Sequence, residues 1–278
     1  MTAGDLVEPA ARRLRAAAVE DARREAQLLL QATAAVDARL HPDRPVSAQA
    51  AEAFSRAVAR RAAREPYAYI TGHREFAGVD LVVSPAVLIP RPETELLVER
   101  ACALLGAGGV VCDLCTGSGA IALAVLARRP DAEVTGTDIS GRALRVAAAN
   151  ARRLNLPLRL RRGDLWEALP PAERGRLDLC TCNPPYVEER DWRELQPEIR
   201  DWEPRLALVP AGGWRAFYAR LCDGARASLR PGGWLLCEVG RGQAAGVAGL
   251  LAGAGWYAVR VVPDLAGIPR LVEGRWGA

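Results

Sequence analysis

The feature that most constrains the fold of this chain is a regular alternation of expected strands and helices after residue 109. Apolar segments typical of buried strands occupy residues 109–115, 132–138, 158–164, 176–182 and 232–240, and helical patterns begin at Gly119 and Ser140. Strands joined by helical crossovers pair in parallel, and the helices cover both faces of the sheet. We therefore expect an α/β fold with a doubly wound sheet. The last two strands, 256–265 and 269–276, have no helix between them and should be antiparallel.

A different pattern precedes this region and predicts a separate domain. Up to Arg64, apolar residues recur at three- and four-residue intervals with one break at residues 41–47, which indicates a group of helices. The next segment alternates around Gly78 like short strands or a hairpin, and a helix capped near Thr94 should follow it. The predicted parts are a helical domain over residues 1–65, a β-hairpin linker over 66–92 and a catalytic domain over 93–278.

The composition excludes several classes of enzyme. All 37 basic residues are arginine, so no lysine is present to bind phosphate in a P-loop or to form a Schiff base. With only two histidines, a histidine-rich metal site is not expected. The seven cysteines, an odd number in apolar segments, indicate buried thiols in a reducing compartment. Cys112 and Cys115 have no second pair at zinc-ligand spacing, so we expect no metal there.

Charge and hydropathy bear on the partners of the chain. The net charge of +4 is mild, and the arginines at positions 60, 61 and 64 are expected on a solvated face. The sequence has no uncharged apolar run of membrane-spanning length and no signal-peptide core at its start. We expect a cytoplasmic protein with no membrane partner and no direct sequence-specific contact with nucleic acid.

A glycine-rich turn between the first strand and its helix predicts a cofactor site. Gly117 and Gly119 would let a ligand approach the backbone, which side chains at these positions would block. Asp138, at the end of the next strand, can accept hydrogen bonds from both hydroxyls of a ribose. These features fit G-x-G-x-x-A and so allow a nicotinamide cofactor as well. A sheet of this kind that ends in an antiparallel pair is also the arrangement of S-adenosylmethionine-dependent methyltransferases.

The third strand ends in two further candidate cofactor ligands, Asp164 and Trp166. A carboxylate there can accept a hydrogen bond from an adenine amino group. An indole can cover the face of the adenine ring. The alternative for Trp166 is a place in the core, since tryptophans are usually well buried.

The segment Asn183–Tyr186, N-P-P-Y, follows the fourth strand and should lie at the same edge of the sheet as the glycine turn. Pro184 and Pro185 fix two φ angles and so stiffen the loop. The Asn183 side-chain oxygen and the Pro184 carbonyl are two acceptors suited to both hydrogens of a planar NH2 group. Tyr186 can supply a face for a flat conjugated group.

Such acceptors suit methyl transfer to a conjugated nitrogen, whose lone pair is poorly available. Two accepted hydrogen bonds push electron density onto the nitrogen as it becomes positive, so they strengthen in the transition state. The remaining contribution is the alignment of nitrogen, methyl carbon and sulfur. A glutamine amide and the amino group of adenine in DNA or RNA both meet this description, and a plain loop turn is the alternative without chemistry.

The chain resembles the PrmC/HemK family, the glutamine methyltransferases that act on class I peptide chain release factors. N-P-P-Y alone is shared with adenine-amino methylases, and its combination with "IPRPETE" is far more specific. The likeness covers nearly the whole chain and is carried by residues 64–78, 88–99, 113–124, 136–144, 183–187 and 202–208.

The resemblance implies a class I methyltransferase fold, S-adenosylmethionine as cofactor and a release-factor glutamine in a Gly-Gly-Gln loop as substrate. The helical domain would then dock the release factor. The implied cofactor ligands are Cys115, Thr116, Gly117, Ser118, Gly119, Asp138, Ile139, Asp164, Trp166 and Asn183, and Asn183, Pro184, Pro185 and Tyr186 would hold the substrate amide, with Asn183, Pro184 and Tyr186 catalytic. Two departures stand out. Cys115 stands where the family usually has glycine, and a cysteine is accommodated there if its φ is negative. Residues 211–214 replace a usual Asp-Gly.

Overall fold

The computed structural model describes residues 1–277, and contacts within the chain divide it into two compact units. The first unit consists of residues 1–73 and residues 196–202. The second consists of residues 74–195 and of the chain from Glu203 onward. The predicted boundaries at residues 65 and 92, between the helical domain, the linker and the catalytic domain, remain predictions.

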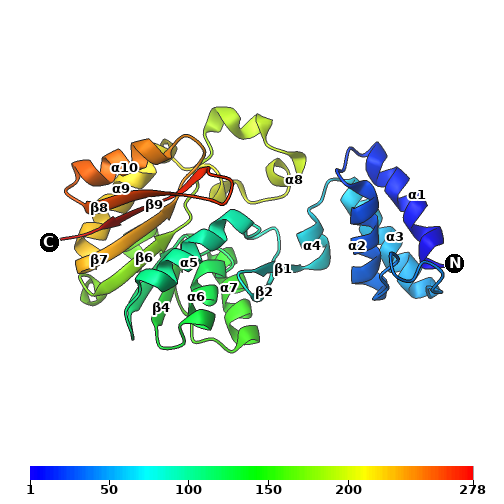
Figure 1. Ribbon diagram of the computed structural model, residues 1–278, viewed down its shortest axis with the longest axis horizontal. Helices are drawn as coiled ribbons and strands as arrows, with labels where there is room; N and C mark the ends of the chain where they lie inside the picture. The colour runs from blue at the N-terminus through cyan, green and yellow to red at the C-terminus, as the bar shows by residue number, and fades with distance from the viewer. Residues whose placement is uncertain (278) are drawn as a thin grey trace. The chain divides into compact units, whose positions relative to one another are not determined.

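The first unit is helical, as the spacing of its apolar residues predicts. Its main helices are α1 (Ala3–Ala16), α2 (Ala22–Ala34) and α3 (Ala48–Ala62), drawn in blue to cyan in Figure 1. Their alanine-rich faces pack around Leu14, Leu30 and Phe54, which are at most 3% exposed. A capping box between Thr2 and Asp5 begins α1, because each residue's side chain accepts a hydrogen bond from the other's backbone N–H.

Two arginines of this unit do not lie on a solvated face as expected. Arg61 is buried, and its guanidinium binds Glu25 on one side and Glu198 of the short helix α8 (Pro197–Arg200) on the other, at 3.0 and 2.9 Å. Arg64 adds a bidentate pair to Glu198. Planar guanidinium groups can bind a buried carboxylate in this way because two N–H groups match its two oxygens. The bonds from Arg61 and Arg64 to Glu198 fix α8 within the helical unit.

A short helix stands where the sequence suggests only strands. Residues Tyr67–Thr71 form α4, which ends at Gly72 with φ of +80°. Its aromatic and β-branched residues favour a strand, yet Pro66 before it and Gly72 after it delimit one helical turn. The expected hairpin follows, with β1 (His73–Phe76) and β2 (Val79–Val82) joined through Gly78.

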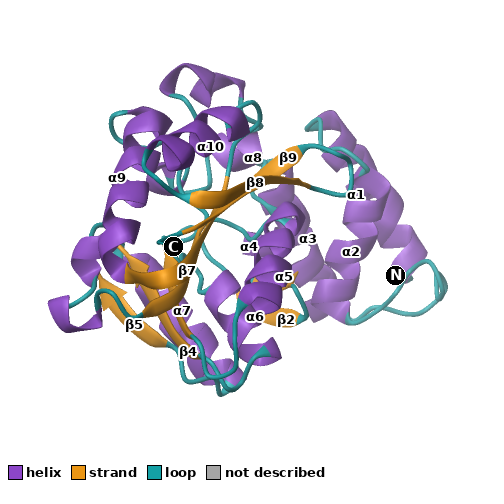
Figure 2. Cartoon of the chain, turned by 60° about the vertical axis from the view of Figure 1, so that its left-hand side comes forward, coloured by secondary structure: helices purple, strands orange, loops and turns teal. Residues whose placement is uncertain are grey.

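The second unit contains the predicted doubly wound sheet. Its strands lie in the order β5-β4-β3-β6-β7-β9-β8, and the neighbours among β3 to β7 are parallel. The last two strands are antiparallel to each other, and β9 also pairs antiparallel with β7, as Figure 2 shows. The strands are β3 (Val110–Leu114), β4 (Glu133–Asp138), β5 (Arg159–Arg162), β6 (Leu177–Cys182), β7 (Leu229–Glu238), β8 (Tyr257–Pro263) and β9 (Pro269–Arg275).

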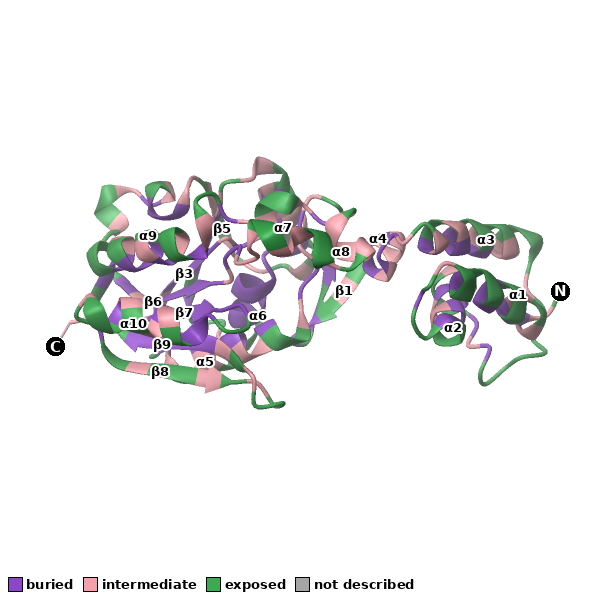
Figure 3. Ribbon diagram, turned by 90° about the horizontal axis from the view of Figure 1, so that it is seen from above, coloured by how far each residue is buried: buried purple, intermediate pink, exposed green. Residues whose placement is uncertain are grey.

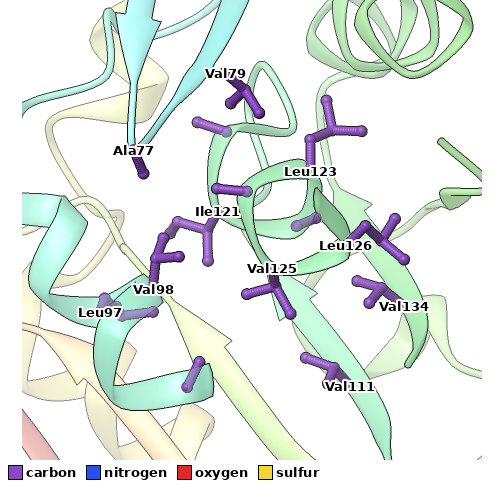
Figure 4. Packing of buried hydrophobic residues seen from close by; sticks show 14 of the residues in the cluster. Ala77, Val79, Leu97, Val98, Val111, Ile121, Leu123, Val125, Leu126 and Val134 are labelled. Carbon is purple, nitrogen blue, oxygen red and sulfur yellow. The ribbon is translucent and has the colours of Figure 1, made fainter. Parts of the chain in front are cut away.

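Helices cover both faces of this sheet and form two separate cores. Alternate residues of one strand enter different cores, as Val111 and Cys112 of β3 do. On one face, Val125 and Leu126 of α6 lie beside Val111 and Val134 (Figure 4). The inner strands β3, β6 and β7 are mostly buried, whereas β8 at the edge of the sheet is mostly exposed, and the helices keep exposed outer faces (Figure 3). The helices of this unit are α5 (Glu95–Leu104), α6 (Ala120–Arg128), α7 (Gly141–Leu154), α9 (Gly213–Ser228) and α10 (Ala244–Gly253).

The described part of the chain holds no helix whose length and apolar character would suffice to span a bilayer. Within the same residues no group of histidine, cysteine and acidic side chains is placed to bind a metal ion. The seven cysteines are free thiols, Cys112 and Cys115 among them.

Candidate active site

A cavity lies at the carboxyl edge of the sheet, where a doubly wound fold is expected to bind its ligand. Its wall combines the glycine turn after β3, the end of β4 and the loop after β6. Of the site residues predicted from the sequence, nine line it: Cys115, Thr116, Gly117, Ser118, Asp138, Ile139, Asp164, Asn183 and Pro185. The structure thus brings both halves of the predicted site to one cavity.

The two glycines of the turn serve different purposes. A Cβ at Gly117, where φ is +56°, would meet no atom closer than 4.0 Å, so this position leaves open space towards the cavity. A Cβ at Gly119, where φ is +81°, would lie 3.1 Å from Leu123 and 3.3 Å from Ala147. Gly119 therefore allows α6 and α7 to pack closely, and of the two only Gly117 lies on the cavity wall.

Cys115 adopts a backbone conformation that its side chain disfavours. Its φ is +58°, in the left-handed region, so the condition of a negative φ is not met and the turn is strained at this residue. A Cβ in this region costs about 1–2 kcal/mol because it approaches the following carbonyl oxygen. The strain lies in the wall of the cavity, where the turn is held from both sides by Asp113 and Asp138.

We expect Cys115→Gly to stabilise the second unit by about 1 kcal/mol, because the relieved strain exceeds the extra entropy that glycine gives the unfolded chain. Urea unfolding under reducing conditions measures the difference. Cys115→Ala is the matched control, since it removes the thiol but keeps the Cβ and should give no such gain. Equal stability of the glycine and alanine variants would show that the turn is not strained at this residue.

Asp138 both anchors the turn and faces the cavity. One carboxylate oxygen accepts from the backbone N–H of Gly117 at 2.9 Å, and the other accepts from that of Ser140 at 2.8 Å. Burial raises the pKa of Asp138, and these two backbone bonds partly oppose that rise. The side chain of Ser140 itself caps α7, so Asp138 is not needed as the cap. Each oxygen keeps a lone pair for a further donor.

Two buried polar residues behind the turn escaped the sequence analysis. Asp113 accepts hydrogen bonds from the hydroxyls of Thr116 at 2.6 Å and Thr181 at 2.7 Å, and burial raises its pKa to about 6. Asn150 of α7 binds the carbonyl of Ser118 and the backbone of β2. The signal for Asn150 was present, because it is a polar residue on the otherwise apolar inner face of an amphipathic helix.

The end of β5 agrees with the predictions in part. Asp164 lines the cavity, and Arg220 of α9, also on its wall, binds the Asp164 carboxylate at 2.6 Å. The structure places Trp166 in the core and not on the cavity wall. Its indole donates to the Leu221 carbonyl at 2.9 Å and occupies the space over Gly224. Leu165, with φ of +49°, lines the cavity in its place.

The N-P-P-Y loop has one face on the cavity and one in the protein. Pro184 and Pro185 are both buried, and Pro185 lines the cavity together with Asn183. The phenol of Tyr186 donates to Glu238 at 3.2 Å, and its backbone carbonyl accepts from the Gln243 side chain at 2.8 Å. Burial raises the pKa of Tyr186, so the phenol is neutral and cannot act as a base.

The segment that carries "IPRPETE" also contributes to the wall of the cavity. Leu88, Pro90 and Thr94 line it together with Pro204. Glu203, whose side chain is 1% exposed, binds Arg91 at 2.5 Å and joins this segment to the one at residues 203–211. Thr94 occupies the N-cap position of α5, as the sequence predicts, but its side chain makes no capping hydrogen bond. Its hydroxyl instead donates to the buried Glu238 at 2.6 Å and accepts from the Asn183 amide at 3.2 Å.

Comparison with known proteins decides the family. Residues 5–72 match the family model of the PrmC N-terminal domain, and residues 92–199 match that of the methyltransferase small domain. The release factor glutamine methyltransferase of Cereibacter sphaeroides is 45% identical over 280 residues, which cover 99% of either chain. This chain belongs to the release factor glutamine methyltransferase family. A relative with the same description from Geobacter sulfurreducens is 40% identical and covers 93% of this chain and 91% of its own.

Membership of the release factor glutamine methyltransferase family makes the chain a methyltransferase, and it does not support the nicotinamide alternative for the glycine turn. The crystal structure of a methyltransferase from Pyrococcus furiosus, 18% identical, matches with a TM-score of 0.55 over 72% of this chain and 90% of its own. That match shows the class I methyltransferase fold. The family resemblance and the fold predicted from the sequence are therefore confirmed.

Proposed function

We propose that this protein transfers a methyl group from S-adenosylmethionine to the N5 amide nitrogen of the glutamine in the Gly-Gly-Gln motif of class I peptide chain release factors. The supporting observation is that one cavity joins the glycine turn, Asp138, Asn183 and Pro185. The names of the relatives support the choice of substrate. A substrate of the translation apparatus also suits the expected cytoplasmic location.

The residues at the carboxyl edge fit S-adenosylmethionine. The open space above Gly117 admits a ligand to the backbone of the turn, and Asp138 beside it offers lone pairs for two ribose hydroxyls. Ile139 and Leu165 supply apolar surface for a flat ring, and Asp164 can accept from its amino group. When bound, the cofactor would supply an electrophilic methyl carbon attached to a positively charged sulfur.

Asn183 and the Pro184 carbonyl would orient the substrate amide. In this arrangement each accepts one hydrogen of the NH2 group, which turns the nitrogen lone pair towards the methyl carbon. As the carbon–nitrogen bond forms and the bond from the methyl carbon to sulfur breaks, the nitrogen becomes positive and its hydrogens become more acidic. Both accepted bonds then strengthen, so they stabilise the transition state more than the ground state. No side chain has to remove a proton before the transfer, because one of the acidified hydrogens is released to solvent after it.

The helical unit is proposed to dock the release factor, which would leave the second unit to bind the cofactor and the glutamine loop. The family model that matches residues 5–72 supports a role specific to this family. The fixed position of α8 on Arg61 and Arg64 makes residues 196–202 part of the same docking unit. Sequence-specific contact with nucleic acid is not part of the proposal.

The test uses the purified full chain with isotopically labelled S-adenosylmethionine. We expect label in one glutamine of a class I release factor, identified by mass spectrometry of its peptides. A release factor with alanine in place of that glutamine is the matched control and should take up no label. Oligonucleotides with adenine form the third arm. Label in adenine and none in the release factor would contradict the proposal and indicate the alternative, an adenine-amino methyltransferase.

A further inference from the structure

Four polar groups behind the N-P-P-Y loop form a continuous hydrogen-bonded chain. The Asn183 amide nitrogen donates to the Thr94 hydroxyl oxygen at 3.2 Å, and this hydroxyl donates to one oxygen of Glu238 at 2.6 Å. The other oxygen of Glu238 accepts from the Tyr186 phenol at 3.2 Å. Thr94 and Glu238 are 3% and 4% exposed, so water does not compete for these bonds.

The direction of these bonds is determined when Glu238 is ionised. An ionised carboxylate can only accept, so Glu238 takes a hydrogen from Thr94 and another from Tyr186. A threonine hydroxyl has one hydrogen, and once it points to Glu238 only lone pairs remain on the side that faces Asn183. The group of Asn183 that faces Thr94 must then be its NH2. Its oxygen is therefore the atom left for a substrate donor.

The opposite orientation of the amide would be unfavourable on both sides. The Asn183 oxygen would face the Thr94 oxygen with no hydrogen between them, and two acceptors at hydrogen-bond distance repel each other. The NH2 group would face the substrate NH2 in turn, where two donors meet. The amide of asparagine has nearly the same shape in both orientations, so shape alone does not select the productive one.

The elements around Glu238 hold this carboxylate in place. Its own backbone carbonyl accepts from the Tyr218 hydroxyl at 2.6 Å. Gln243 binds both the Tyr186 carbonyl and the backbone N–H of Gly240. Burial raises the pKa of Glu238, and the hydrogen bonds from Thr94 and Tyr186 and the charge of Arg270 oppose that rise. The carboxylate is thus built into the end of β7.

We propose that Glu238 and Thr94 are positioning residues that set the hydrogen-bond direction of Asn183, so that its oxygen and not its NH2 group meets the substrate amide. This inference rests on the proposed function, because it assigns a task to Asn183 that only a donor substrate requires. Neither residue needs to touch the substrate for this role. Thr94 belongs to "IPRPETE", so its hydrogen bond with Asn183 links that motif to N-P-P-Y.

Thr94→Val tests this role, because valine keeps the shape and removes the hydroxyl. We expect kcat to fall about 10- to 100-fold, as for misplacement of a reacting group, with the Kd of S-adenosylmethionine within twofold of the wild type. Thr94→Ser should restore most of the activity. Glu238→Gln should also lower kcat, since its NH2 group can donate and so release the Thr94 hydrogen. Thr135→Val, the same change at a buried site on β4, is the matched control and should leave kcat unchanged.

A second measurement does not depend on turnover. The chain has three asparagines, Asn150, Asn155 and Asn183, so labelling asparagine with 15N gives three side-chain NH2 signals. We expect the Asn183 signal to shift or broaden in both Thr94→Val and Glu238→Gln, while the other two signals stay in place. An unmoved Asn183 signal would overturn the inference, and so would a Thr94→Val variant with wild-type kcat. If the wild type transfers no methyl group to release factor, the proposed function fails while the NMR result still decides the positioning role.

Discussion

Asn183→Ala should lower kcat for release-factor methylation by about 100- to 1,000-fold, the range found when one group that stabilises developing charge is removed. The side-chain oxygen of Asn183 is one of the two proposed acceptors for the substrate NH2 group. Without it the amide can rotate, and the remaining bond to the Pro184 carbonyl cannot alone turn the lone pair towards the methyl carbon. Because these bonds strengthen as the nitrogen becomes positive, the loss should appear in kcat more than in KM.

The affinity for the cofactor should change much less in this variant. Asn183 is only one of many residues on the cavity wall, and the glycine turn and Asp138 remain in place. Single-turnover transfer of labelled methyl measures the chemical step, and titration calorimetry measures the Kd of S-adenosylmethionine. Asn155→Gly is a suitable control, since Asn155 is an exposed residue with φ of +52° after α7, where glycine is readily accommodated. A variant Asn183→Ala with more than about a tenth of wild-type kcat would contradict the assigned role.

The sequence predicts the strands of the sheet well, because they share one repeated pattern, and it predicts single elements such as α4 less well. Seven strand segments and the antiparallel final pair follow from apolar patterning, because burial on a sheet imposes a period that any such strand must share. The helix α4 has only five residues, and their preference for strands outweighs the weaker signals of Pro66 and Gly72.

The errors within the site have a common physical cause. Trp166 and Leu165 are adjacent, and with Leu165 at a positive φ it is Leu165 that lines the cavity while Trp166 lies in the core. A single residue in the left-handed region leaves no mark in a sequence when it is not glycine. The same holds for Cys115, whose strained conformation is imposed by its neighbours and not by its own preference.

Long-range polar pairs were also beyond reach of the sequence. Thr94 and Glu238 are 144 residues apart, and no local pattern relates them. A sign was nevertheless present, because Glu238 is a charged residue in the apolar segment of β7 and such residues are rarely buried without a partner. An acid within a strand that is buried on both faces should therefore be treated as a candidate for a positioning role.

Asp138→Ala should have the complementary effect, a large loss of cofactor affinity. The carboxylate is proposed to accept from the ribose hydroxyls, and hydrogen bonds to charged groups contribute about 1.5–3 kcal/mol each. It also holds the N–H groups of Gly117 and Ser140, so its removal loosens the turn that the cofactor would contact. We expect the Kd of S-adenosylmethionine to rise at least about 100-fold, which corresponds to about 3 kcal/mol.

Asp138→Ala should impair cofactor binding, whereas Asn183→Ala should impair the methyl transfer itself. At saturating cofactor Asp138→Ala should recover a substantial part of wild-type kcat, because the acceptors for the substrate amide are intact. Calorimetric titration gives the Kd, and the rise in Tm on addition of cofactor gives an independent measure, since a ligand that binds only the folded state stabilises it by RT ln(1 + L/Kd), where L is the free ligand concentration. Glu133→Ala, on the exposed start of the same strand, is the control and should bind normally. A Kd for Asp138→Ala within about threefold of the wild type would show that the carboxylate serves the turn alone, because even one lost hydrogen bond to a charged group should cost more than that.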